Sequence, residues 1–215
     1  MPLIIAGVFL LLFIIVALMT SGTQGFVMDE SVAYWADQQT NATFIKLMEI
    51  ASVIGSSELI LLTTVIIGLV LLIQRNWHHF FFFFVLSVGG VILNLALKML
   101  VRRARPGDEV SFIEVFGFNL ELQSYSFPSG HTMRATILFL FLMYIAFYFG
   151  KRMAMQVVAY IIYVLLIISV ALSRVMLEAH FMTDILGAIV VSIAWFFFCI
   201  YFFYRPKRSS YSLFS

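Results

Sequence analysis

Charged residues are scarce in this chain of 215 residues. They make up 11% of the sequence, whereas hydrophobic residues make up 63%. The mean hydropathy of +1.05 lies far above that of soluble globular domains, so the composition excludes that class and predicts an integral membrane protein. The formal net charge of +2 is small, and we expect no nucleic acid partner.

Cysteine is nearly absent. The single cysteine, Cys199, lies in the middle of an apolar run, which excludes a disulfide framework and a thiol metal site and leaves packing as its expected role. The sequence also has no internal repeat. The first apolar run, residues 2–21, lacks the basic residues that begin a signal peptide. A cleaved signal peptide is the alternative, but we expect this run to be a transmembrane helix.

Six apolar runs account for most of the chain. A helix needs about 20 apolar residues to cross a bilayer, and the runs lie at residues 2–21, 59–73, 80–100, 132–149, 155–176 and 183–204. Between the first two, residues 22–57 alternate charged and apolar side chains, which is typical of an amphipathic segment in the membrane interface. We therefore predict an all-α integral membrane protein with six transmembrane helices, folded as one domain over residues 1–215.

The third run contains two local features that predict how its helix packs. Residues 80–84 are all phenylalanine, and we expect them to face lipid. Gly89 and Gly90 follow in the same helix, and small residues allow helices to approach one another closely in membranes. The sequence therefore predicts that the first part of this helix contacts lipid and that its middle packs closely against another helix.

Basic residues gather in the turns on one side of the predicted membrane. With six spans, the basic residues on that side are Arg75, Lys151, Arg152 and those within 205–208. Because cytoplasmic loops carry an excess of Lys and Arg, both termini are predicted to be cytoplasmic, in the cytoplasmic membrane. Arg102, Arg103 and Arg105 fall on the outer side and break this bias, which indicates another role for them.

The turn between the fifth and sixth runs carries three ionisable residues, Arg174, His180 and Asp184. A charged side chain facing lipid costs at least about 2.5–3.5 kcal/mol at a helix centre, so such residues usually face a polar cavity and serve a function. On a helix His180 and Asp184 would share a face, so the carboxylate could bind one imidazole nitrogen and leave the other free to attack. Arg174 would lie on a different face, so we expect the chain to turn near residues 177–179.

A second stretch, Pro128 to His131, directly precedes the fourth run. Ser129 can cap the helix that starts there, and Gly130 lets a ligand approach the free backbone N–H groups of its first turn. Such a helix start attracts anions. The third stretch consists of Lys98 and, seven positions later, Arg105 followed by proline. With Arg174 these residues supply three cations on the same side, and so many donors predict a phosphate site.

In order and spacing, the three stretches match the signature of the type 2 phosphatidic acid phosphatase superfamily. Each stretch alone is a weak signal, but the combination is specific. The chain resembles that family over about residues 78–204, and its other helices fit the integral-membrane branch with six spans. The resemblance implies a phosphomonoester or diphosphate hydrolase that uses a histidine nucleophile and no metal or other cofactor.

Carried over residue by residue, the resemblance implies that His180 is the nucleophile that forms a phosphohistidine. Asp184 would orient His180. His131 would protonate the leaving oxygen and later activate water. The residues implied to bind the phosphoryl oxygens are Lys98, Arg105, Ser129, Gly130 and Arg174.

Three charged residues lie outside the signature. Arg102 and Arg103 are expected either to contact a second phosphate or anionic headgroups, or to anchor the chain at the interface. Arg134 shares the helix face of His131 and is expected either to reach the site or to pair with an acid such as Glu178. Residues 107–127 form a long polar connection, which we expect to cover the site.

The expected function is a lipid phosphatase of the cytoplasmic membrane with its site on the outer side. It would be similar to the bacterial phosphatases that act on phosphatidylglycerol phosphate or undecaprenyl diphosphate, with phosphatidic acid as a third candidate substrate. The alternatives are a lipid or drug transporter and a catalytically silent protein that binds phosphate lipids. Two histidines with Asp184 argue against the silent protein, and few charged residues lie near mid-membrane as a transporter would require. The substrate and the oligomeric state stay open at this point.

Overall fold

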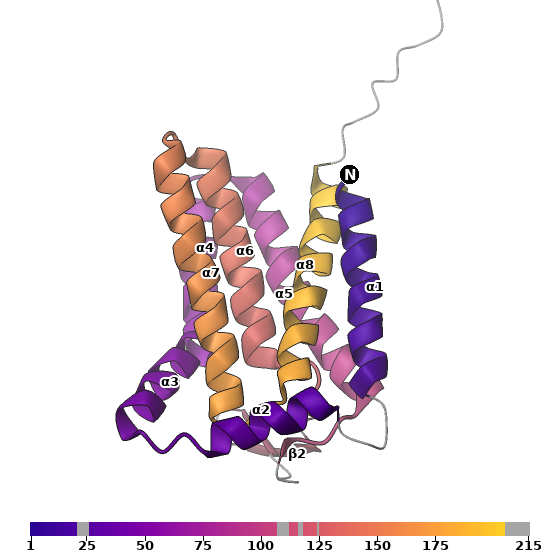
Figure 1. The fold of residues 1–215 in the computed structure, drawn as a ribbon. Coiled ribbons are helices and arrows are strands. Elements are labelled where there is room, and N and C mark those ends of the chain that lie inside the picture. The colour runs from indigo at the N-terminus through magenta and orange to yellow at the C-terminus, as the bar shows by residue number, and fades with distance from the viewer. Residues whose placement is uncertain (21–25, 107–111, 116–117, 124, 205–215) are drawn as a thin grey trace, which may run out of the picture.

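The computed structural model describes residues 1–20, 26–106, 112–115, 118–123 and 125–204 (Figure 1). Its elements follow in the order α1 Pro2–Thr20, α2 Val27–Asp37, α3 Ala42–Ile54, α4 Ser57–Ile73, α5 Trp77–Val101, β1 Phe112–Val115, β2 Phe118–Gln123, α6 Gly130–Phe149, α7 Met153–Met176 and α8 Met182–Phe203. The basic tail, residues 205–208, lies outside the described part.

All six apolar runs form helices. α1, α5, α6, α7 and α8 are each long and apolar enough to cross a membrane. α4 has 17 residues and is long enough to cross a membrane only together with α3. The two helices meet at a bend of 41°. The described residues therefore hold five candidate spans, or six when the bent pair counts as one. The amphipathic segment predicted between the first two runs forms α2 and α3, so the predicted all-α membrane fold is confirmed.

The helices form an upright bundle with two helices across one end (Figure 1). α1 and α4 to α8 stand side by side, whereas α2 and α3 lie across the end where α7 finishes and α8 begins. The N-terminus, the turn between α6 and α7 and the end of α8 lie at the opposite end. α1 packs along α8, and α6 contacts α5, α7 and α8. The start of α6 and the start of α8 are thereby brought to the same end as α2.

Helix starts follow the capping residues in the sequence. The Ser56 hydroxyl accepts a hydrogen bond from the Leu59 N–H at 3.2 Å, and the Ser129 hydroxyl accepts one from the Thr132 N–H at 3.5 Å. The first N–H groups of a helix have no partner within it, so a side-chain oxygen at this position stabilises the start. The predicted Ser129 cap is confirmed, and it fixes where α6 begins beside His131.

The phenylalanine run of α5 does not face lipid as a whole, so that prediction is wrong. Phe82 and Phe83 are 0% and 2% exposed, whereas Phe81 and Phe84 are each 52% exposed. The Phe83 ring stacks on that of Phe141 in α6, with the ring centroids 4.2 Å apart. Five consecutive residues exceed one turn of 3.6 residues, so some members of the run must point into the bundle.

Gly89 and Gly90 mark the close helix contact predicted in α5. A Cβ atom added to Gly89 would lie 2.5 Å from Cζ2 of Trp195 in α8. One added to Gly90 would lie 2.4 Å from Cδ1 of Ile137 in α6. Both distances are far below van der Waals contact, so larger residues would force these helices apart. The prediction from the two glycines is confirmed.

A short hairpin interrupts the long connection between α5 and α6. β1 and β2 pair antiparallel, with Val115 opposite Phe118 and Glu114 opposite Asn119. The predicted all-α fold did not include these two strands. The prediction that residues 107–127 cover the site concerns some residues that lie outside the described part. Of the described residues, those of β2 lie at the same end of the bundle as α2 (Figure 1).

Candidate phosphate-transfer site

His180 lies in the turn between α7 and α8. α7 ends at Met176 and α8 begins at Met182, so the predicted turn is present and His180 itself is not helical. Glu178 has a left-handed backbone with a φ of 51°. The N–H groups of Ala179 and His180 both donate to the Arg174 carbonyl, at 3.1 and 3.2 Å. These bonds close the end of α7 and hold His180 against the start of α8.

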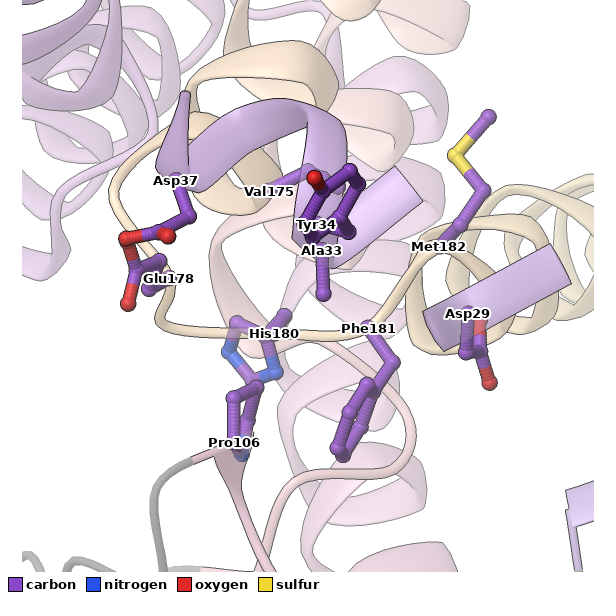
Figure 2. A pocket seen from close by; sticks show the side chains of 10 residues that line it. All are labelled: Asp29, Ala33, Tyr34, Asp37, Pro106, Val175, Glu178, His180, Phe181 and Met182. Atoms are coloured by element: carbon purple, nitrogen blue, oxygen red, sulfur yellow. The ribbon is translucent and has the colours of Figure 1, made fainter. Parts of the chain in front are cut away.

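A pocket of about 320 Å³ reaches His180 (Figure 2). The residues that line it come from α2, from the end of α7 and the turn that follows, and from the segment after α5. They are Asp29, Ala33, Tyr34, Asp37, Pro106, Val175, Glu178, His180, Phe181 and Met182. His180 is only 3% exposed. The nucleophile candidate is therefore buried beside an opening that apolar side chains and the carboxylates of Asp29, Asp37 and Glu178 line together.

Asp184 and Ser126 fix the ring of His180. His180 Nδ1 lies 3.4 Å from Asp184 Oδ2 and 3.2 Å from Ser126 Oγ. The Ser126 hydroxyl donates to the same carboxylate oxygen, so its lone pair is left to accept from Nδ1–H. The Phe181 N–H also donates to Oδ2, at 3.0 Å. Both neighbours thus favour the proton on Nδ1, which leaves the lone pair on Nε2.

His180 is held in its neutral form. Burial lowers the pKa of His180 to about 4, and the hydrogen bond to Asp184 opposes that shift. The nearby cations Lys98 and Arg105 lower this pKa further. Desolvation disfavours the charged form of a buried imidazole. His180 therefore carries a free lone pair near neutral pH, as a nucleophile requires.

Ser129, Gly130 and His131 form the start of α6. Ser129 is fully buried, and its N–H donates to the Asp184 carbonyl at 3.2 Å, which ties the start of α6 to the start of α8. A Cβ on Gly130 would lie 3.3 Å from Asn94 Oδ1, so the helix start is closely packed. His131 lies in the first turn and within electrostatic reach of His180. The two predicted histidines are thus brought to one site, His131 from the start of α6 and His180 from the turn before α8.

The predicted cations surround the same place. Lys98 donates to the Tyr125 carbonyl, and Arg174 donates to the Ser52 hydroxyl of α3 at 2.6 Å. The charges of Arg105 and Arg174 both act on His131. Among the described residues, the Nε groups of Arg134 and Arg174 are buried without a hydrogen-bond partner. A buried donor without a partner is costly, so these two groups are suited to binding an anion.

Arg103 and Asp29 belong to the site although sequence reasoning did not assign them to it. Arg103 forms ion pairs with Asp29 of α2 at 2.7 Å and with Asp184 at 2.6 Å. Its guanidinium also lies over the Phe181 ring, 4.2 Å from the ring centroid. This position differs from the second-phosphate and interfacial roles expected for Arg103. Its outer-side location was the only signal in the sequence, and Asp29 had none.

The described residues show no ion pair between Arg134 and Glu178, which was one of the two roles expected for Arg134. The acid whose charge acts on it is Glu58, at the start of α4. The Arg134 side chain also lines a second pocket of about 320 Å³ between α4, α5 and α6. The other lining residues are Ser57, Ile60, Leu61, Thr64, Ser87, Val88, Val91, Ile137 and Leu138. Because Leu61, Val88 and Val91 are exposed, this apolar pocket faces the side of the bundle.

Comparisons with known proteins agree with one another. A model of the PAP2 superfamily matches residues 79–208. Over 121 residues the chain is 32% identical to phosphatidylglycerophosphatase B of Bacillus subtilis (strain 168), a match that covers 54% of this chain and 54% of that protein. The chain thus aligns with about half the length of this curated relative. The crystal structure of the first transmembrane PAP2 type phosphatidylglycerolphosphate phosphatase from Bacillus subtilis gives a TM-score of 0.78 at 26% identity, over 95% of this chain and 98% of that chain.

Proposed function

The chain belongs to the PAP2 superfamily, and from this membership and the geometry around His180 we propose that it is a membrane lipid phosphatase. The observation that carries the proposal is the placement of His180, whose Nδ1 lies 3.4 Å from Asp184 Oδ2 and 3.2 Å from Ser126 Oγ. This arrangement directs the proton to one nitrogen and the lone pair to the other. We propose one domain over residues 1–215, since α1 packs along α8.

His180 acts as the nucleophile in the proposed reaction. Nε2 attacks phosphorus, the bond to the ester or diphosphate oxygen breaks, and a phosphohistidine forms. As positive charge develops on the ring, the Asp184 carboxylate at Nδ1 stabilises it. Water then attacks phosphorus, the P–N bond breaks, and inorganic phosphate leaves with the lone pair returned to Nε2.

His131 acts as the general acid and then as the general base. It protonates the leaving oxygen in the first step and accepts a proton from water in the second. Its place in the first turn of α6 supports this role, because the free N–H groups of a helix start attract anionic groups such as a phosphoryl group. Gly130 keeps this approach open. Ser129 stabilises the turn as its cap and ties it to Asp184.

Cations of the chain balance the charge of the transferring phosphoryl group. Phosphoryl transfer depends mainly on positioning and on stabilising charge on the equatorial oxygens. We assign this task to Lys98, Arg105 and Arg174, and the unpartnered Nε of Arg174 supports the assignment. Among the described residues, no group of three or more His, Cys, Asp and Glu side chains could hold a metal ion. We propose that these three cations take the place of a metal ion in balancing the phosphoryl charge.

The substrate is a lipid that carries a phosphomonoester or diphosphate. The candidates are phosphatidylglycerol phosphate, undecaprenyl diphosphate and phosphatidic acid, and the first of these fits the names of both relatives. The apolar pocket beside Arg134 faces the side of the bundle, so an acyl or prenyl chain can lie there while its phosphate reaches His131. We place the site on the outer side of the cytoplasmic membrane, because the basic turns gather at the other end.

Phosphate release from purified protein in detergent tests the proposal. The three candidate lipids are supplied one at a time, with EDTA present, and His180→Ala is assayed beside the wild type. We expect the wild type to hydrolyse at least one lipid with EDTA present and the variant to hydrolyse none. No release from any of the three lipids, or activity that EDTA abolishes and added metal restores, contradicts the proposal.

A further inference from the structure

Asp29 of α2 binds the start of α8, although the two are far apart in the sequence. The side chain is 2% exposed. Its Oδ1 accepts from the Thr183 N–H at 2.9 Å, and its Oδ2 accepts from the Thr183 hydroxyl at 2.6 Å. Thr183 lies in the first turn of α8, where N–H groups have no partner within the helix. Asp29 therefore caps α8 from another helix and fixes α2 over the His180 turn.

Arg103 connects Asp29 to Asp184. One amino group donates to Asp29 Oδ2 at 2.7 Å. The other donates to Asp184 Oδ1 at 2.6 Å and to the Thr183 hydroxyl at 2.6 Å. A planar guanidinium with both amino groups engaged has a single orientation, and the Phe181 ring beneath it restricts it further.

The two oxygens of Asp184 have separate tasks. Oδ1 is bound to Arg103, and Oδ2 faces His180, Ser126 and the Phe181 N–H. With Oδ1 fixed, the carboxylate cannot rotate about its terminal bond, and Oδ2 stays directed at His180 Nδ1. Without Arg103 this constraint is lost, and only Ser126 and the Phe181 N–H then hold the acceptor of His180 in place.

We propose that Asp29 and Arg103 are positioning residues for the nucleophile: Asp29 holds Arg103, Arg103 holds Asp184, and Asp184 fixes the tautomer of His180. The inference rests on the proposed phosphatase reaction and extends it to α2. The helix that lies across the end of the bundle is thus part of the catalytic apparatus. A small misplacement of a reacting group lowers turnover by about 10²-fold in other enzymes. We therefore expect loss of this series of contacts to lower kcat by about 10-fold to 100-fold.

Asp29→Asn is the informative change. The amide oxygen still accepts from the Thr183 N–H, but the charge that holds Arg103 is gone and an NH₂ group now faces another donor. Glu30→Gln is the matched control, because it removes the neighbouring carboxylate of α2, which is exposed. Asp29→Asn should lower kcat with little change in KM, and it should also lower the unfolding temperature in detergent because it breaks a buried ion pair. Glu30→Gln should change none of these.

A double-mutant cycle separates positioning from a purely structural role. If Asp29 acts through Asp184, Asp29→Asn should have no further effect on kcat in an Asp184→Asn background. The nitrogen chemical shifts of the His180 ring, measured by NMR on isotope-labelled protein, provide a readout independent of activity. They should show one tautomer in the wild type and a mixture in Asp29→Asn.

The outcomes separate this inference from the proposed function. An active wild type whose kcat and His180 shifts are unchanged by Asp29→Asn overturns the inference alone, as does an equal loss in both backgrounds. An inactive wild type overturns the proposed function, and the His180 shifts then decide the positioning claim. If Asp29→Asn does not fold, Arg103→Lys replaces it, since one ammonium group cannot bind both carboxylates in the same way. It should give the same loss of kcat and the same tautomer mixture, and wild-type values would overturn the inference.

Discussion

Acidification from pH 7 to pH 5.5 should leave His180 uncharged in the folded protein. Burial lowers the pKa of His180 to about 4, from an ordinary value of 6.5. At about pH 5.5 a histidine with a pKa of about 4 is roughly 97% neutral, whereas one with a pKa of 6.5 is roughly 10% neutral. The nucleophile therefore stays available at a pH where a solvent-exposed histidine is mostly protonated.

The same shift sets how His180 contributes to stability. The unfolded chain has the ordinary pKa, so between about pH 6.5 and pH 4 it binds more protons at this position than the folded chain does. The contribution of His180 to the free energy of unfolding is thus fully present above about pH 6.5. It is lost as the pH falls toward the folded pKa of about 4.

An NMR titration of isotope-labelled histidine in detergent measures this directly. His180 is assigned from a His180→Ala variant, and Asp184→Asn serves as the comparison. Asp184 raises the pKa of His180 against the effect of burial, so its replacement should move the midpoint still lower. A midpoint near 6.5 in the wild type, or a midpoint that rises in Asp184→Asn, refutes the reasoning.

Two further predictions concern the bundle and its orientation. Phe83→Ala should lower the free energy of unfolding by about 3–5 kcal/mol, because a buried ring leaves a cavity, whereas the half-exposed Phe84→Ala should cost about 0.5 kcal/mol. Equal losses in reversible unfolding would contradict the packing described for α5. A cysteine introduced by Lys151→Cys should react with a membrane-impermeant thiol reagent only after the cells are opened, because residue 151 lies at the proposed cytoplasmic end. Labelling in intact cells would reverse the topology.

The sequence predicts the helices well because each apolar run has to satisfy its backbone inside the membrane. It fails where the outcome depends on which face meets another helix. The phenylalanine run shows this, because hydrophobicity alone does not distinguish Phe83, packed on Phe141, from lipid-facing Phe84. The bend of 41° between α3 and α4 escaped prediction for a related reason, since the polar residues at the break also fit a simple helix start.

Residues near the reacting phosphate are easier to predict than those that hold them. Asp184 can be paired with His180 from their spacing, although His180 proves to lie in a turn. The partners of Arg103 cannot be found in this way, because Asp29 lies 74 positions earlier in the chain and Asp184 lies 81 positions later. Their contact exists only because α2 lies across the start of α8. Local sequence patterns carry no information about that arrangement.

Rapid-quench labelling tests the central claim, a phosphohistidine at His180, most directly. The substrate is a radiolabelled phosphate ester with a phenolic leaving group, which needs no proton to depart, and the protein is the His131→Ala variant. Loss of His131 removes about 10²–10⁴-fold of acid–base catalysis and slows the attack of water, so the intermediate should accumulate. We predict acid-labile phosphate that maps to His180 and is absent from the His131→Ala/His180→Ala protein. Label that persists in the double variant, or that maps to another residue, would contradict the account.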